Sequence, residues 1–129
     1  MKDIFQEGDL LTTEVIVSEN DVAEFNGKII HPVYSTFALG RDAEWACRQF
    51  VLQMKEDDEE GVGTFLTVQH HSPAKVKDHV TFEAVVESIQ GNEIICHYTA
   101  KVNDRLIADG KQGQKILKKT KIQLLFGTL

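Results

Sequence analysis

The sequence is short of the residues that hold small secreted or metal-stabilised domains together. Its 129 residues include two cysteines, two prolines and one tryptophan. Cys47 and Cys96 are too few and too far apart in the chain for a disulfide framework or a zinc site of the usual spacing. Both lie in apolar patterns, which predicts that they are buried, reduced thiols.

Long hydrophobic runs are also missing. No stretch reaches the roughly 18 apolar residues that a membrane-spanning helix needs. The first residues, MKDIFQEGD, mix both charges and are followed by no apolar segment of the kind found in signal peptides. We therefore expect a cytoplasmic protein with no membrane partner.

Positive charge is scarce relative to negative charge. There are 14 Lys and Arg against 20 Asp and Glu, which gives a net charge of -6 and an isoelectric point of about 5.3. This balance argues against a general nucleic-acid-binding protein, because phosphate contacts rely on Lys and Arg. Five lysines nevertheless gather near the C-terminus without an acidic residue among them: Lys111, Lys115, Lys118, Lys119 and Lys121. Such a cluster is typical of a solvated edge strand, and it would also attract a phosphate-bearing ligand.

Several familiar motifs are absent from the sequence. There is no HExxH, CxxC or GxSxG, and no P-loop or GxGxxG. His70 and His71 are adjacent, and adjacent residues of a strand point to opposite faces, so they do not easily share one metal ion. We expect no metal site and no resident cofactor.

A single domain over residues 1–129 is predicted by the length and by the lack of a linker or repeat. Its clearest element is a helix over residues 36–55, with Ser35 or Thr36 as the N-cap. The apolar face of this helix consists of Leu39, Ala43, Ala46, Cys47, Phe50, Val51 and Met54. The opposite face consists of Arg41, Asp42, Arg48, Gln49 and Gln53, interrupted by Trp45 and Leu52.

Strand-like segments flank this helix. Residues 10–17 are rich in Thr, Val and Ile, and residues 18–25 predict a short helical turn. After Gly61 the hydrophobic period changes to two, which predicts strands over residues 62–71, 79–89, 93–102 and 105–117 joined by short hairpin turns. This order favours an α+β fold, in which an antiparallel sheet of five strands wraps around one long central helix.

Glu44 is the first candidate for chemistry. Its helical neighbours Gly40, Cys47 and Val51 are small or apolar, so its carboxylate could be partly desolvated and suited to acid–base or nucleophilic work. Arg41 and Arg48 lie one helical turn away, and an ordinary surface ion pair is the commoner explanation of such a carboxylate.

His70 and Thr36 are the other two candidates. His70 continues the strand face of Thr64, Leu66 and Val68, where a neutral histidine can act as a general base. A satisfied core or rim histidine is more common at such a position. Thr36 can simply cap the helix, or the same helix N-terminus can steady a developing oxyanion.

The arrangement of these residues is more informative than any one of them. The segments HPVYSTFALGRDAEWACRQF and VGTFLTVQHHSPAKVKDHVTFEAVVESI resemble the hot-dog fold thioesterases of the fluoroacetyl-CoA thioesterase-like family. In that family a Pro-Val-x-Ser/Ala-Thr segment precedes the central helix, a Glu follows the Thr by eight residues, and a Gly-Thr strand carries a His near its end before a Pro-containing loop. The matching positions are Pro32, Val33, Ser35, Thr36, Glu44, Gly63, Thr64, His70 and Pro73.

This resemblance implies a hot-dog domain that forms a homodimer and binds an acyl-CoA thioester at the dimer interface, with CoA as part of the substrate. It implies Glu44 as nucleophile or general base, His70 as general base for water, and Thr36 as the group that holds the carboxylate or the acyl group. The backbone N–H of Gly63 would help to hold the thioester carbonyl. The expected activity is hydrolysis of a short or medium acyl-CoA, and pairing of dimers into tetramers is left open.

Two positions depart from the family pattern. A Gly-x-His-x-Arg segment is usual on the last strand, and here Gln112 and Gln114 replace its His and Arg. Ile30 stands where the fluoroacetate-specific member has a gating Phe, so fluoroacetyl-CoA is not the expected substrate. The alternatives are a non-catalytic acyl-CoA-binding or regulatory module, another thioester reaction such as enoyl-CoA hydration, and a purely structural protein.

Overall fold

The computed structural model describes residues 1–127. Its elements are β1 (Leu10–Ile16), the 3-10 turn η1 (Glu19–Asp21), β2 (Val22–Phe25), β3 (Lys28–Tyr34), α1 (Thr36–Met54), β4 (Glu59–Leu66), β5 (Gln69–His70), β6 (His79–Gln90), β7 (Glu93–Val102), β8 (Arg105–Lys118) and α2 (Lys119–Gly127).

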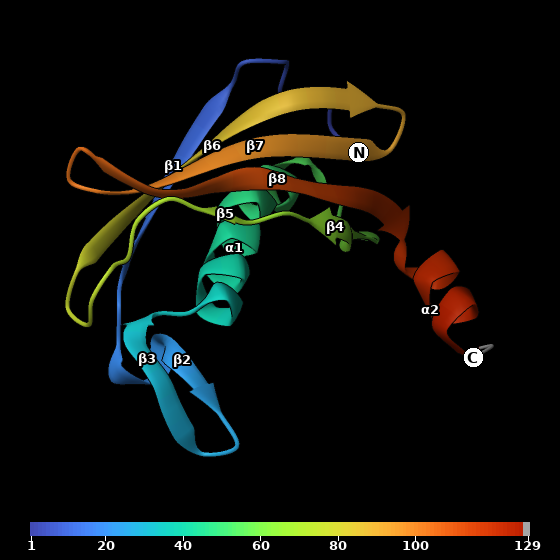
Figure 1. Ribbon diagram of the computed structural model, residues 1–129. Coiled ribbons are helices and arrows are strands. Elements are labelled where there is room, and N and C mark those ends of the chain that lie inside the picture. Colours follow the sequence, from blue (N-terminus) through green and yellow to red (C-terminus); the bar gives the residue numbers. More distant parts are fainter. Residues whose placement is uncertain (128–129) are drawn as a thin grey trace.

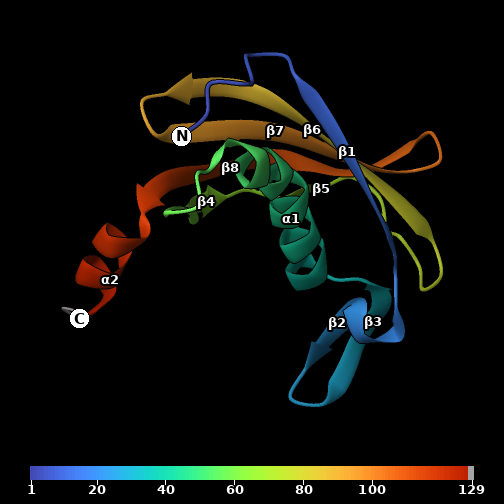
Figure 2. The ribbon, with the colours of Figure 1, turned by 180° about the vertical axis from the view of Figure 1, so that it is seen from behind.

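One curled antiparallel sheet covers a single side of α1 (Figures 1 and 2). Its five main strands run in the order β1-β6-β7-β8-β4. The short β5 also pairs with β8, at residues that precede those paired with β4. The β2–β3 hairpin lies apart from this sheet at the N-terminal end of α1, and α2 extends away after β8. The predicted α+β architecture of a five-stranded sheet around one long helix is confirmed.

The core lies between α1 and the concave face of the sheet. All seven residues of the predicted apolar helix face are buried, from Leu39 to Met54. Alternate residues of β6 and β7 meet them, because side chains of a strand point to one face at every second position. Cys47 and Cys96 are free thiols in this core, and their mutual hydrogen bond together with burial raises the pKa of Cys47.

The short helical turn predicted after Ser18 is confirmed, since Ser18 is the N-cap of η1 over Glu19–Asp21. The strand that follows was not predicted: Val22–Phe25 pair with β3 in a hairpin. Asn26 and Gly27 both have positive φ at its tip, which is the Asn-Gly turn that favours such hairpins. The strand predicted over residues 62–71 is two strands, because the chain leaves the ladder between Leu66 and Gln69. The first of them, β4, also starts earlier than predicted, at Glu59.

The lysine cluster does not mark an edge strand. β8 lies inside the sheet, between β7 and β4, and α2 follows it. Lys111 pairs with Glu87, and Lys118 pairs with Asp58. Asp42, expected on the polar helix face, is buried. None of the helices over residues 1–127 is long and apolar enough to cross a membrane.

Candidate active site

Two adjacent hydroxyls open α1, and they have different partners. Ser35 is the N-cap, and its Oγ accepts a hydrogen bond from the N–H of Ala38 at 3.0 Å. Thr36 is therefore not needed as a cap, and its Oγ1 lies 2.9 Å from Nε2 of His70. This contact joins the start of α1 to β5 and brings together two of the three predicted catalytic residues.

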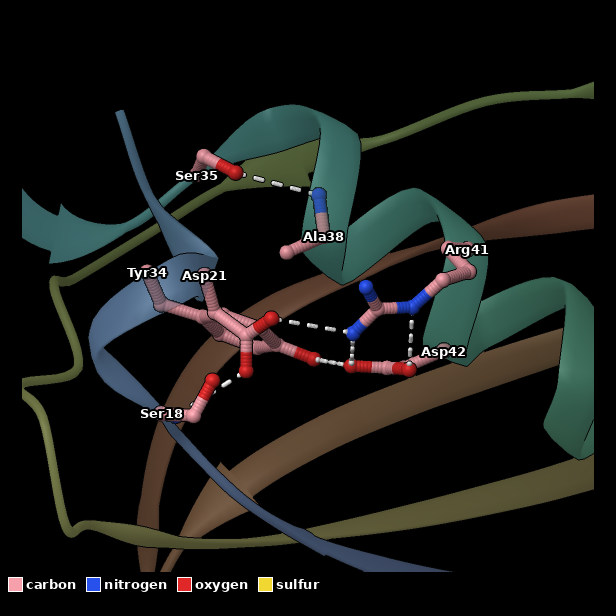
Figure 3. A network of polar contacts seen from close by, with 7 residues as sticks. All are labelled: Ser18, Asp21, Tyr34, Ser35, Ala38, Arg41 and Asp42. Atoms are coloured by element: carbon pink, nitrogen blue, oxygen red, sulfur yellow. Dashed lines mark hydrogen bonds and ion pairs between the residues drawn. The ribbon is translucent and has the colours of Figure 1, made fainter. Parts of the chain in front are cut away.

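A partly buried polar network fixes the chain just before this contact (Figure 3). The hydroxyl of Tyr34 donates to Asp42, and Arg41 binds both Asp42 and Asp21. Burial acts to raise the pKa of Asp21, but hydrogen bonds from the N–H of Ser18 and from Arg41 hold it below its ordinary value. The network ties η1 and β3 to the first turns of α1, so the position of Thr36 is set from both sides.

Glu44 lies two turns further along α1, where it faces β8 and β4. Its Oε1 accepts a hydrogen bond from Nε2 of Gln112 at 3.3 Å. A Cβ on Gly63 would lie 2.6 Å from the same oxygen, so the carboxylate sits directly against the backbone of β4. The predicted residues Glu44 and Gly63 are thus neighbours in space.

The ion-pair explanation of Glu44 does not hold within residues 1–127. Arg48 pairs with Glu60 on β4 at 2.7 Å, and Arg41 pairs with Asp21 and Asp42. The expected partial burial of Glu44 is also not seen in the single chain, where Glu44 is exposed. Its apolar neighbours on the helix turn inward to the core, and its carboxylate lies on the open side.

A cavity adjoins the Thr36–His70 contact. Both residues line a hollow of about 350 Å³, with Val33, Leu39 and Ile107 among its apolar walls. A second hollow of about 520 Å³ lies between the β2–β3 hairpin and the start of α1, and Thr36 lines this one as well. Thr36 therefore stands between two spaces of the size that small ligands occupy.

His71, Gln112 and Gln114 are the remaining polar residues near the site. His71 pairs with Asp109 at 3.0 Å and does not join His70. Within the described part of the chain, no group of three or more His, Cys, Asp or Glu could hold a metal ion. Gln112 and Gln114, which the sequence marks only as replacements, are buried directly behind Glu44. The sequence does not reveal this position, because a strand pattern does not show which helix residue lies opposite.

Comparison with known proteins identifies the family and agrees with the fold. Residues 17–120 match the sequence model of a family described as fluoroacetyl-CoA-specific thioesterase. No curated protein matches the sequence. Among solved structures, a hypothetical protein of Thermus thermophilus described as a thioesterase superfamily member is 29% identical, with 98% of this chain and 93% of that chain covered and a TM-score of 0.92.

Two further structures share the fold. A variant of the fluoroacetyl-CoA-specific thioesterase FlK is 20% identical over 98% of both chains, with a TM-score of 0.88. A hot-dog-like protein from Thermanaerovibrio acidaminovorans is 20% identical over 96% of this chain and 92% of that chain, with a TM-score of 0.88. The chain therefore has the hot-dog fold and belongs to the fluoroacetyl-CoA-specific thioesterase family, so that it is an enzyme of the thioesterase class.

Proposed function

We propose that this thioesterase hydrolyses short or medium acyl-CoA thioesters with Thr36, Glu44 and His70 as its catalytic residues. The observation that carries the proposal is the 2.9 Å contact between Thr36 and His70 beside a cavity, with Glu44 exposed on the same helix. A hydroxyl and a carboxylate of α1 and an imidazole of β5 supply the groups that thioester hydrolysis needs.

The carboxylate of Glu44 can act in two ways. As a nucleophile, one of its oxygens bonds to the carbonyl carbon, the C–S bond breaks, and CoA leaves as a thiolate that takes up a proton. Water then attacks the resulting anhydride, gives a proton to His70, and releases the carboxylic acid and free Glu44. As a general base, Glu44 itself removes the proton from the attacking water.

Thr36 and Gly63 have supporting roles in this mechanism. The Thr36 hydroxyl holds the ring of His70, and it donates when Nε2 carries no proton. The backbone N–H of Gly63 is proposed to hold the thioester carbonyl next to Glu44, whose carboxylate already lies against this residue.

A second copy of the chain is proposed to complete the site. Thr36, Glu44 and His70 are all exposed in one chain. An enclosed site excludes bulk water and strengthens the electrostatic interactions that act on the thioester. β4 lies at one end of the strand order, and large apolar residues are exposed beside the site on β4 and α1: Trp45, Leu52, Phe65 and Leu66. Covering these side chains in a homodimer would bury apolar surface and exclude bulk water together.

The acyl group is proposed to be an ordinary short or medium chain. Ile30 stands at the place of the gating Phe, and it is half exposed on the β2–β3 hairpin. Because this position lacks the aromatic ring, selection of a fluorinated acyl group is not expected.

A thiol-release assay tests the proposal. The panel runs from acetyl-CoA to palmitoyl-CoA and includes fluoroacetyl-CoA, with Glu44→Ala measured beside the wild-type chain. We expect turnover of short or medium chains that Glu44→Ala abolishes. Thermal stabilisation by acyl-CoA without any thiol release would instead support the non-catalytic binding module, and unchanged turnover by Glu44→Ala would overturn the site.

A further inference from the structure

Two buried glutamines stand behind Glu44. Gln112 and Gln114 are 1% and 2% exposed, and they occupy alternate positions of β8, so both face α1. A buried amide is costly unless its N–H and C=O groups are hydrogen-bonded. The burial of these two amides therefore needs a structural or functional explanation.

The hydrogen bonds of these amides form one directed chain. Nε2 of Gln114 donates to Oε1 of Gln112 at 3.0 Å. Nε2 of Gln112 then donates to the carbonyl of Gly113 at 3.1 Å and to Oε1 of Glu44 at 3.3 Å. Turning the Gln112 amide over would set its oxygen against two acceptors, a carbonyl and a carboxylate, so the chemistry of the partners allows only this orientation.

Two glycines of β4 make room for this chain. A Cβ on Gly61 would lie 2.9 Å from Oε1 of Gln114, and one on Gly63 would lie 2.6 Å from Oε1 of Glu44. Gly61 and Gly63 share one strand face. The amides are therefore confined between β8, α1 and a β4 surface that carries no side chain at either place, and Oε1 of Glu44 reaches this surface at Gly63.

The donor that reaches Glu44 is neutral. Arg48, the nearest cation on the same helix face, is committed to Glu60 at 2.7 Å. A guanidinium would bind the carboxylate more strongly and in a bidentate way, which would occupy both oxygens. One amide N–H holds one oxygen in place and leaves the other oxygen, and the full negative charge, for the reaction.

We propose that Gln112 is a positioning residue for Glu44, with its own amide oriented by Gln114. The relay holds Oε1 of Glu44 against Gly63 and directs the second carboxylate oxygen toward the acyl-CoA thioester. This inference rests on the proposed function of Glu44. It also assigns a role to the two glutamines that replace the usual His and Arg: they form a neutral relay where the family pattern has basic side chains.

The test compares three substitutions in the full-length chain. Gln112→Met keeps the volume and removes the donor, and Gln112→His keeps an N–H donor. Gln90→Met is the control at an exposed glutamine, the last residue of β6. For the best acyl-CoA of the panel, Gln112→Met is expected to lower kcat by about 10- to 100-fold, the effect of a lost hydrogen bond to a charged group, with KM changed by less than about twofold. Gln112→His is expected to retain more of kcat, and Gln90→Met all of it.

A double substitution separates positioning from folding. Gln112→Met alone leaves the buried amide of Gln114 without its acceptor, so the melting temperature should fall; in Gln112→Met with Gln114→Met both amides are gone and stability should largely return. The inference requires kcat to stay low in this double variant. If kcat recovers with stability, or if Gln112→Met leaves kcat unchanged in an active enzyme, the inference is overturned while the proposed function stands. A wild-type chain without turnover overturns the proposed function itself.

Discussion

At the scale of single residues, two neighbouring hydroxyls at the start of α1 are expected to serve different purposes, one in stability and the other in activity. Ser35 caps the helix and Thr36 contacts His70. Ser35→Ala is expected to lower stability by about 1 kcal/mol, the usual cost of a lost N-cap, with activity largely kept. Thr36→Val is expected to leave the melting temperature unchanged and to lower kcat/KM by about tenfold or more, because the imidazole loses its hydroxyl partner.

Thermal unfolding and thiol release on the same protein samples measure both effects. Thr36→Ser is the matched control, since it removes a methyl group and keeps the hydroxyl. A Thr36→Val variant that is destabilised as much as Ser35→Ala but fully active would show that Thr36 has a structural role only.

The sequence identifies Glu44 as a candidate but does not show its surroundings. A helical wheel places Arg41 and Arg48 next to it, yet both arginines find carboxylates on other elements, Asp21 on η1 and Glu60 on β4. Helical spacing cannot reveal such partners, because they depend on how the chain folds back on itself. Asp42 is misplaced on the polar face for the same reason: its partner Tyr34 precedes the helix.

At the scale of elements, strong periodicity made the predictions accurate. β7 has the predicted bounds, 93–102, and α1 ends one residue before the predicted 55. The failures lie where the pattern is short. The helical turn after Ser18 is as predicted, but the strand Val22–Phe25 was missed, because it depends on pairing with β3. α2 was not predicted, since its lysines gather at the start and its apolar residues follow one another without forming a clear helical face.

The network that joins η1 to α1 predicts a pH dependence of stability. The pKa of Asp21 is lowered in the folded chain from an ordinary value of 3.8, because the Ser18 N–H and Arg41 outweigh burial. The unfolded chain therefore binds the proton more readily, so the stabilisation is complete well above pH 3.8 and is lost as the pH falls through and below that value. Asp21→Asn should remove this part of the acid sensitivity.

Melting temperatures between about pH 6 and about pH 3 measure this effect. Asp21→Asn should be less stable than the wild-type chain at the upper end, and the difference should shrink toward the lower end. Asp104→Asn, in the exposed β7–β8 turn, is the control for a change of net charge. A constant difference between Asp21→Asn and wild type across the range would contradict the prediction.

At the scale of the whole molecule, the single chain leaves its own site open. The sheet has two outer strands, β1 and β4, and both expose large apolar side chains, including Ile16 on β1 and Phe65 on β4. Unpaired strand edges of this kind invite pairing with another chain. Only β4 is next to Glu44, since Gly63 of this strand contacts the carboxylate. The β4 edge is therefore the one whose covering would also enclose the proposed catalytic residues.

Matched charges on the two edges test which one is covered. If β4 forms the interface of the proposed homodimer, Phe65→Glu is expected to give a monomer in light scattering and to lower turnover in parallel, because a buried, unpaired carboxylate at the interface is strongly unfavourable. Ile16→Glu introduces the same charge at the other edge, where its side chain is 59% exposed, and should leave both mass and activity unchanged. Phe65→Glu that stays dimeric and active, with Ile16→Glu monomeric, would place the interface on β1. Full activity of a monomeric Phe65→Glu enzyme would mean that one chain is sufficient for catalysis, and the exposed site would then need no partner.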